Sequence, residues 1–156
     1  MMTMDAITSD PDWRGGEYED QPMRALRTAA DLLVIAGSAP IYQQQTYPTR
    51  AAADDYITKT IPDRMMKMDA NDLLYQVAAS RNYNPSPRVE AIRARFIWVN
   101  SADDFINPPE LGIAEREIKR MPTGKFVQLP ASAETRGHGS HTWAKLWQDH
   151  LAKLLK

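Results

Sequence analysis

The segment Arg95-Phe96-Ile97-Trp98-Val99-Asn100-Ser101-Ala102-Asp103-Asp104 decides the fold class of this 156-residue chain. Its first half is a short apolar run rich in β-branched and aromatic residues, which is typical of a strand, and the run ends abruptly in an acidic turn. A similar run, Lys125-Phe126-Val127-Gln128-Leu129, follows later. Between them, Pro108-Pro109 opens a predicted helix that runs to Met121 and ends at Pro122-Thr123-Gly124. This order predicts two parallel strands joined by a right-handed crossover, and therefore an α/β fold.

Helices are predicted on both sides of this unit. After a loop from Pro130 to Gly139, residues 141–155 place apolar side chains at helical spacing and predict an amphipathic closing helix. Residues 1 to about 85 contain no β-rich alternation. Their spacing predicts helices from Pro22 to Gly37, where Pro40 marks the stop, from Ala51 to Thr60 with an end at Pro62, and from a cap at Asp69 or Asn71. We therefore divide the chain into a helical region, 1–88, and a strand-helix-strand-helix unit, 89–156.

The composition excludes several classes of function. Apolar residues make up 43% and charged residues 25%, which is typical of a globular domain. Nineteen basic against twenty acidic residues leave a net charge of −1, so we expect no nucleic-acid partner. There is no cysteine, which excludes a thiolate nucleophile and suits a reducing cytoplasm. No apolar run approaches the roughly 20 residues of a membrane-spanning helix, and the first residues lack a basic leader, so we expect neither a membrane span nor secretion.

An acid and a histidine follow the two predicted strands. Parallel neighbouring strands end at the same edge of a sheet, where open α/β folds bind their ligands. Asp103 and Asp104 leave the first strand there, and Gly137-His138-Gly139 follows the second. A carboxylate that accepts a hydrogen bond from one imidazole nitrogen leaves the other nitrogen free to take a proton. The pattern therefore predicts a charge-stabilised general base.

Structural interpretations of the same residues stay open. The two aspartates suit a solvated turn or a helix cap, and His138 suits a glycine-flanked turn. His141 is explained by capping, and His150 lies on the apolar stripe of the closing helix as a core or interface residue. A metal site built from His138, His141 and an aspartate has only a weak spacing signal, so we expect no metal and no bound cofactor.

Four motifs in the same order resemble the C-terminal part of the homoserine O-acetyltransferase family. They are the segment from Asp10 to Tyr18, similar to DP-x-W-x-x-G-x-Y; Met68-Asp69-Ala70-Asn71 with Leu74-Tyr75; Asn100 to Asp104 with Pro108-Pro109; and Gly137-His138-Gly139. They span almost the whole chain. The resemblance implies a partial α/β-hydrolase fold, in which residues 1–88 form the helical lid and residues 89–156 form the last two parallel strands with their helices.

The resemblance also implies the site. In such proteins the triad aspartate stands four residues before the proline that opens the next helix, which selects Asp104, and the histidine after the glycine is His138. The implied reaction is a Ser-Asp-His acyl transfer between a small-molecule acyl donor and an alcohol acceptor, with acyl-coenzyme A as a candidate co-substrate. A cytoplasmic enzyme of methionine biosynthesis, working as a homodimer, is the family's implied setting.

One essential group of that mechanism has no counterpart in the sequence. None of the seven glycines frames a serine as G-x-S-x-G. We expect the chain to supply the acid and the base while the nucleophile comes from a missing N-terminal half. A truncated gene, a natural remnant and one piece of a split enzyme all fit. Gly139 stands where the family carries an acid that holds the homoserine amino group, so an ester hydrolase remains an alternative. A non-catalytic remnant acting as an association module is the second.

Overall fold

The computed structural model describes residues 1–156 as two compact units. The first unit comprises residues 1–35 and 47–83, and the second comprises residues 36–46 and 84–156. The segment 36–46, which the sequence places in the helical region, therefore belongs structurally with the strand-containing unit. None of the helices combines the length and the apolar character needed to cross a membrane.

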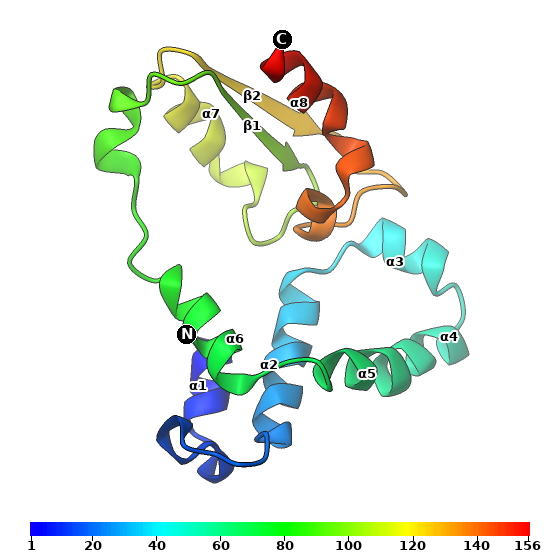
Figure 1. Cartoon of the computed structure of the whole chain (residues 1–156). Coiled ribbons are helices and arrows are strands. Elements are labelled where there is room, and N and C mark those ends of the chain that lie inside the picture. Colours follow the sequence, from blue (N-terminus) through cyan, green and yellow to red (C-terminus); the bar gives the residue numbers. More distant parts are fainter. The chain divides into compact units, whose positions relative to one another are not determined.

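The first unit is entirely helical, as predicted (Figure 1). Its elements are α1 (Met2–Thr8), η1 (Pro11–Gly16), α2 (Met23–Ala36, whose last residue lies in the second unit), α4 (Arg50–Asp55), η2 (Tyr56–Thr60), α5 (Ile61–Met65) and α6 (Ala70–Ala79). The core is formed by Ile7 of α1, Leu26 and Ala29 of α2, and Leu73 of α6, all buried. Because each helix has one apolar stripe, packing these stripes together removes them from water.

A hydrogen-bond network joins the loop after α1 to the start of α6. Trp13 Nε1 donates to Asn71 Oδ1 (2.9 Å), and Asn71 Nδ2 donates to the carbonyl of Gly16 (3.0 Å). The hydroxyl of Tyr18 donates to Asp69 Oδ1 (2.8 Å) and accepts from the backbone N–H of Asn71 (3.0 Å). Asp69 caps α6, and donation from the Asp72 backbone and from Gln21 holds the pKa of its carboxyl below the ordinary value. The first two motifs thus form one structural cluster.

The second unit contains the two strands. Its elements are α3 (Pro40–Thr46), η3 (Ser86–Ala91), β1 (Phe96–Ser101), η4 (Pro109–Leu111), α7 (Ile113–Ile118), β2 (Gly124–Leu129), η5 (Gly139–Thr142), η6 (Ala144–Leu146) and α8 (Gln148–Leu155). The strands pair in parallel with Phe96 opposite Gly124 and Ser101 opposite Leu129, which confirms the predicted strand-helix-strand unit.

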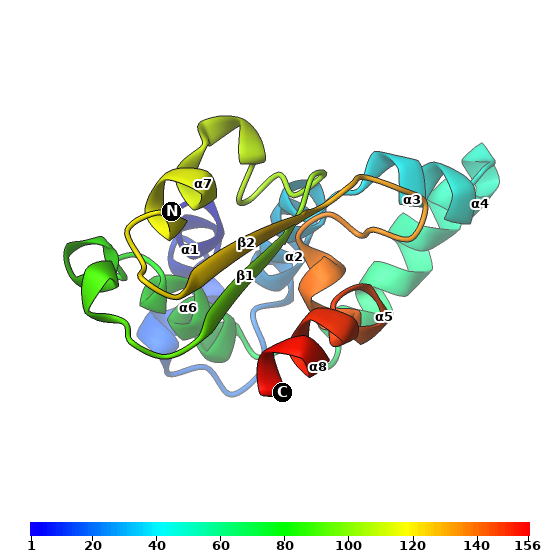
Figure 2. The ribbon, with the colours of Figure 1, turned by 90° about the horizontal axis from the view of Figure 1, so that it is seen from above.

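Side chains alternate between the two faces of the sheet, so one set faces α7 and the other faces α8. Trp98 of β1 and Phe126 of β2 meet edge to face, 6.3 Å apart, and pack with Ile118 at the end of α7. The other face, with Ile97 and Val127, is turned to α8. The ribbon seen from above shows α7 and α8 on opposite sides of the two strands (Figure 2). The unit is thus a small helix-sheet-helix sandwich.

Several helix predictions in the first 88 residues need correction. The helices α1 and α3 were not predicted. Pro40 does not merely mark a stop, because it occupies the first position of α3, where its missing N–H costs nothing. Pro62 does not end the helix that begins at Arg50. The chain passes through the π-helical turn η2 into α5, and Pro62 lies in the first turn after it.

Two further predicted helices are interrupted. The helix expected from Pro108 to Met121 is broken at Gly112, which has a positive φ of 60° between η4 and α7. The closing helix expected over 141–155 is regular only in α8. Before it, the non-helical backbone of Trp143 (φ −109°, ψ 83°) separates the short turns η5 and η6. The ring of Trp143 stacks on Arg136, and this tertiary contact competes with the helical spacing.

Candidate functional site

The ends of the two strands bring the predicted acid and histidine together. Ser101 and Leu129 are paired at the carboxyl end of the sheet, so the loops that follow start from the same edge. Asp104 follows β1, and His138 follows β2 at the entry to η5. His138 Nδ1 lies 3.1 Å from Asp104 Oδ2. The predicted proximity of the two side chains is confirmed, and the structure selects Asp104 over Asp103 as the acid that faces the imidazole.

Asp104 is only 4% exposed, and both oxygens of its carboxylate accept hydrogen bonds. Oδ1 accepts from the backbone N–H groups of Ile106 (2.9 Å) and Asn107 (3.0 Å), and Oδ2 accepts from Asn107 Nδ2 (3.2 Å) and from His138. Burial acts to raise the pKa of Asp104, but the donors from Asn107 and His138 outweigh it and hold that pKa below the ordinary value of 3.8. The group is therefore a carboxylate at neutral pH.

The ionised carboxylate fixes the tautomer of His138. A carboxylate can only accept, so the proton lies on Nδ1 of the imidazole and the lone pair on Nε2. Asn107 Nδ2 also lies 3.3 Å from His138 Nδ1. Both nitrogens are donors that converge on Asp104 Oδ2, so we interpret this approach as a contact between neighbours and not as a hydrogen bond. His138 is about one third exposed and can present Nε2 to a ligand.

Asp103 has a different task from Asp104. Its Oδ2 accepts from the hydroxyl of Thr135 (2.8 Å) and from the backbone N–H of Gly137 (3.4 Å), and its Oδ1 accepts from the Ser101 hydroxyl. Asp103 thereby ties the loop that carries His138 to the end of β1. The two adjacent aspartates therefore divide the work: one meets the imidazole and the other positions its loop.

Gly137 is required both by its backbone angle and by its surroundings. Its φ is 54°, and a Cβ at this position would lie 2.7 Å from the carbonyl oxygen of Ser38 and 3.2 Å from that of Asp103. Backbone atoms cannot move aside as a flexible side chain can. Only glycine lets the loop approach this closely just before the histidine.

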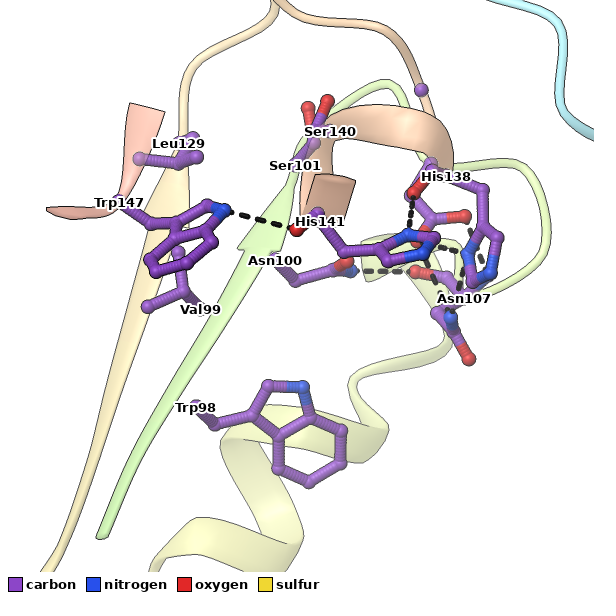
Figure 3. Close-up of a pocket in the computed structure, with 12 residues that line it drawn as sticks. Trp98, Val99, Asn100, Ser101, Asn107, Leu129, His138, Ser140, His141 and Trp147 are labelled. Atoms are coloured by element: carbon purple, nitrogen blue, oxygen red, sulfur yellow. Dashed lines mark hydrogen bonds and ion pairs between the residues drawn. The ribbon is translucent and has the colours of Figure 1, made fainter. Parts of the chain in front are cut away.

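A small cavity of about 140 Å³ lies beside the acid–histidine pair (Figure 3). Its lining residues come from β1, from the turn after it and from the segment after β2; they include Trp98, Asn100, Asn107, His138, His141 and Trp147. His141 Nδ1 donates to the carbonyl of His138 (2.6 Å), and the two imidazole rings lie 5.0 Å apart. The imidazole rings of both His138 and His141 therefore line the cavity.

Ser140 and His150 have structural surroundings, and no metal cluster forms near the pair. Ser140 is 4% exposed, and its hydroxyl accepts from the backbone N–H of Arg136 (2.8 Å), which suits a turn residue. His150 is half-buried on the α8 face of the sheet, away from the acid–histidine pair. His138, His141 and the aspartates do not form a cluster able to hold a metal ion.

Sequence reasoning missed the residues that support the pair. Asn107 places one backbone and one side-chain donor on Asp104, and Thr135 connects Asp103 to the loop after β2. The position of Asn107 directly before Pro108 was a usable signal, because asparagine is common in turns that bond their own backbone. Thr135 carried no signal, since its partner lies 32 residues away.

The fold that these elements define is part of an α/β-hydrolase fold, and comparison with solved structures shows this directly. The structure of a homoserine O-acetyltransferase from Bacillus anthracis is 18% identical with a TM-score of 0.79, and 99% of this chain covers 47% of that protein. The structure of esterase E22 is 19% identical with a TM-score of 0.78, and here 99% of this chain covers 48% of the other.

A third similar structure, of the acetyl esterase MekB, is 21% identical with a TM-score of 0.73, and 98% of this chain covers 48% of it. The chain thus spans about half the length of the structures it matches. No protein-family model and no curated protein sequence matches it. At these identities the comparisons show the fold, and the catalytic roles of Asp104 and His138 remain predictions.

Proposed function

We propose that this chain supplies the acid and the general base of an acyl-transfer site of the homoserine O-acetyltransferase type. The observation that carries the proposal is the 3.1 Å contact between His138 Nδ1 and a buried, ionised Asp104 at the carboxyl edge of parallel strands. This geometry leaves Nε2 of His138 as the only ring nitrogen able to accept a proton. The proposed partner is the N-terminal half of the fold, which would bring a serine in a G-x-S-x-G turn and its oxyanion hole.

The chain's own residues would act in a fixed order during acyl transfer. His138 Nε2 takes the proton from the attacking hydroxyl and later returns it to the leaving group. Asp104 stabilises the imidazolium formed between these steps and keeps its ring oriented. The acyl donor is a thioester or an ester, and the cysteine-free chain suits work in the cytoplasm.

Ester hydrolysis is the second candidate function. Two of the three similar structures described above are those of esterases, and Gly139 leaves the position after the histidine without an acid. Transfer and hydrolysis share the acyl-enzyme and differ in whether an alcohol or water attacks it. Product analysis with acetyl-coenzyme A and homoserine, set against p-nitrophenyl acetate in water, separates the two.

The test is to co-express the chain with the polypeptide encoded upstream of it and to measure the release of p-nitrophenol. We expect a burst from the complex and none from the chain alone, because the nucleophile and oxyanion hole supply most of the rate. His138→Ala should reduce kcat/KM of the complex by roughly 10³-fold or more, whereas the matched control His150→Gln should leave it unchanged. A complex indifferent to His138→Ala would instead support the non-catalytic association module.

A further inference from the structure

Arg136 is held between two aromatic rings in the loop that leads to His138. Its guanidinium carbon lies 3.5 Å from the ring centre of Trp143 and 4.9 Å from that of Tyr42. Tyr42 belongs to α3, and Trp143 is the residue between η5 and η6. Two other segments of the chain therefore meet at the Arg136 side chain. Contacts with the ring faces attract the charge and fix the plane of the guanidinium.

Stacking on the two rings does not satisfy the in-plane donors of Arg136. A guanidinium has five N–H groups around its edge, and contacts with ring faces satisfy none of them. Nε of Arg136 is buried and has no hydrogen-bond partner. A buried charged donor without an acceptor is costly, so its persistence requires an explanation.

The neighbouring carboxylates are already occupied. Glu134, on the same loop, pairs with Lys145 (2.8 Å). Asp103 accepts from Thr135 and Gly137, and Asp104 accepts from Asn107 and His138. No acid of this loop or of the turn after β1 is left to neutralise Arg136. Its acceptor is therefore to be sought outside the chain.

We propose that Arg136 binds an anionic group, a carboxylate or a phosphate, of the small molecule that enters this site. The inference rests on the proposed function, since it names the chemistry of the donor or acceptor that reaches His138. Arg136 lies two residues before the histidine, in the loop that starts from the carboxyl edge of the sheet, the edge where such folds bind ligands. A stacked guanidinium presents a rigid planar fork that matches the two oxygens of a carboxylate or phosphate.

The experiment uses the whole chain and needs no turnover. Inorganic phosphate and acetate are titrated separately at constant ionic strength while the Arg136 Nε–H and Trp143 Nε1–H signals are followed by NMR. Saturable shifts of both signals are expected with at least one anion. Phosphate binding would point to the phosphate groups of an acyl thioester such as acyl-coenzyme A, and acetate binding to a carboxylate-bearing substrate.

Three variants decide what the shifts mean. Arg136→Met keeps an apolar side chain between the rings and should weaken binding about tenfold or more, as expected for loss of a charge-assisted pair. Arg136→Lys keeps the charge without the fork and should bind with intermediate affinity. Arg93→Met, which removes an exposed arginine elsewhere in the same unit, should change nothing.

Shifts that rise linearly with both anions, and equally in the Arg136→Met variant, would overturn the proposal. If Arg136→Met does not fold, Arg136→Lys alone decides, because unchanged affinity in that variant contradicts recognition by the fork. Loss of anion binding would leave the acyl-transfer proposal standing. Conversely, if His138→Ala did not change the activity of the complex, anion binding at Arg136 could still be measured.

Discussion

Replacing Asp104 by asparagine tests how much of the site is built into this chain. The substitution conserves shape and exchanges one acceptor oxygen for an NH₂ group. Four donors now converge on the carboxylate: two backbone N–H groups, the amide of Asn107 and Nδ1 of His138. The asparagine oxygen can replace Oδ1 toward the backbone, but its NH₂ then faces two donors.

The cost follows from the exposure of those two donors. Leaving a buried donor without an acceptor costs about 1–3 kcal/mol. Asn107 is exposed and His138 partly so, and both can turn to water, so we expect Asp104→Asn to lower the free energy of unfolding by about 1–2 kcal/mol. Asp104→Ala also removes the acceptor of the two backbone N–H groups and should lower the free energy of unfolding by about 2–4 kcal/mol.

Urea denaturation followed by circular dichroism measures both values. Asp20→Asn, at an exposed position, serves as the control and should stay within about 0.5 kcal/mol of the parent chain. The His138 imidazole gives a second measurement, because the Nδ1 proton should be seen by NMR in the parent and lost to exchange in Asp104→Asn. Equal stability of the parent, asparagine and alanine variants would refute the conclusion that this carboxylate organises the turn.

Three further outcomes are expected. Gly137→Ala should destabilise the chain by more than Gly112→Ala, for which we expect a cost of about 1 kcal/mol. Both glycines have a positive φ, but only a Cβ at position 137 would meet backbone atoms. Thermal denaturation of the two variants measures the difference. Asn71→Ala should cost about 1–2 kcal/mol in the same assay, since it removes the acceptor of Trp13 and the donor to Gly16. The folded-state pKa of Asp104 is lowered, so its carboxylate stabilises the fold at pH values above the ordinary pKa, and this contribution is lost as the pH falls below about 4. The free energy of unfolding should therefore fall less steeply with decreasing pH in Asp104→Asn than in the parent chain. Equal slopes would contradict this prediction.

The strands and the pair of site residues were predictable because their signals are local. A continuous apolar run rich in β-branched residues marks a strand by itself, and the strand-helix-strand order then dictates parallel pairing. That order brought His138 to the same sheet edge as Asp103 and Asp104, and the family resemblance then selected Asp104 from the two aspartates. The supporting donors could not, because Thr135 meets Asp103 across 32 residues of chain.

The errors lie where a tertiary contact or a special turn overrides periodicity. Residues 141–155 have helical spacing throughout, yet Trp143 leaves the helix and stacks on Arg136. Pro62 has the residue type of a helix stop, but a preceding π-helical turn places it in a first turn. A cation–π contact such as that of Trp143 with Arg136 contributes about 0.5–2 kcal/mol, which can outweigh a local helical preference.

The acid–histidine pair depends on the second unit alone, and this has a consequence for assembly. Every donor to Asp104 and every contact that fixes the loop of His138 comes from residues 36–46 or 84–156. The sheet of this unit has two strands, and two strands seldom form an independently stable sheet. Four apolar side chains near the turn are also exposed: Phe105, Ile106, Leu111 and Ile113. We infer that a partner polypeptide would add strands and cover these side chains without having to rearrange the pair. Light scattering should then show self-association of the lone chain, whereas a sharp monomer peak with a concentration-independent melting temperature would mean that the exposed apolar surface needs no cover.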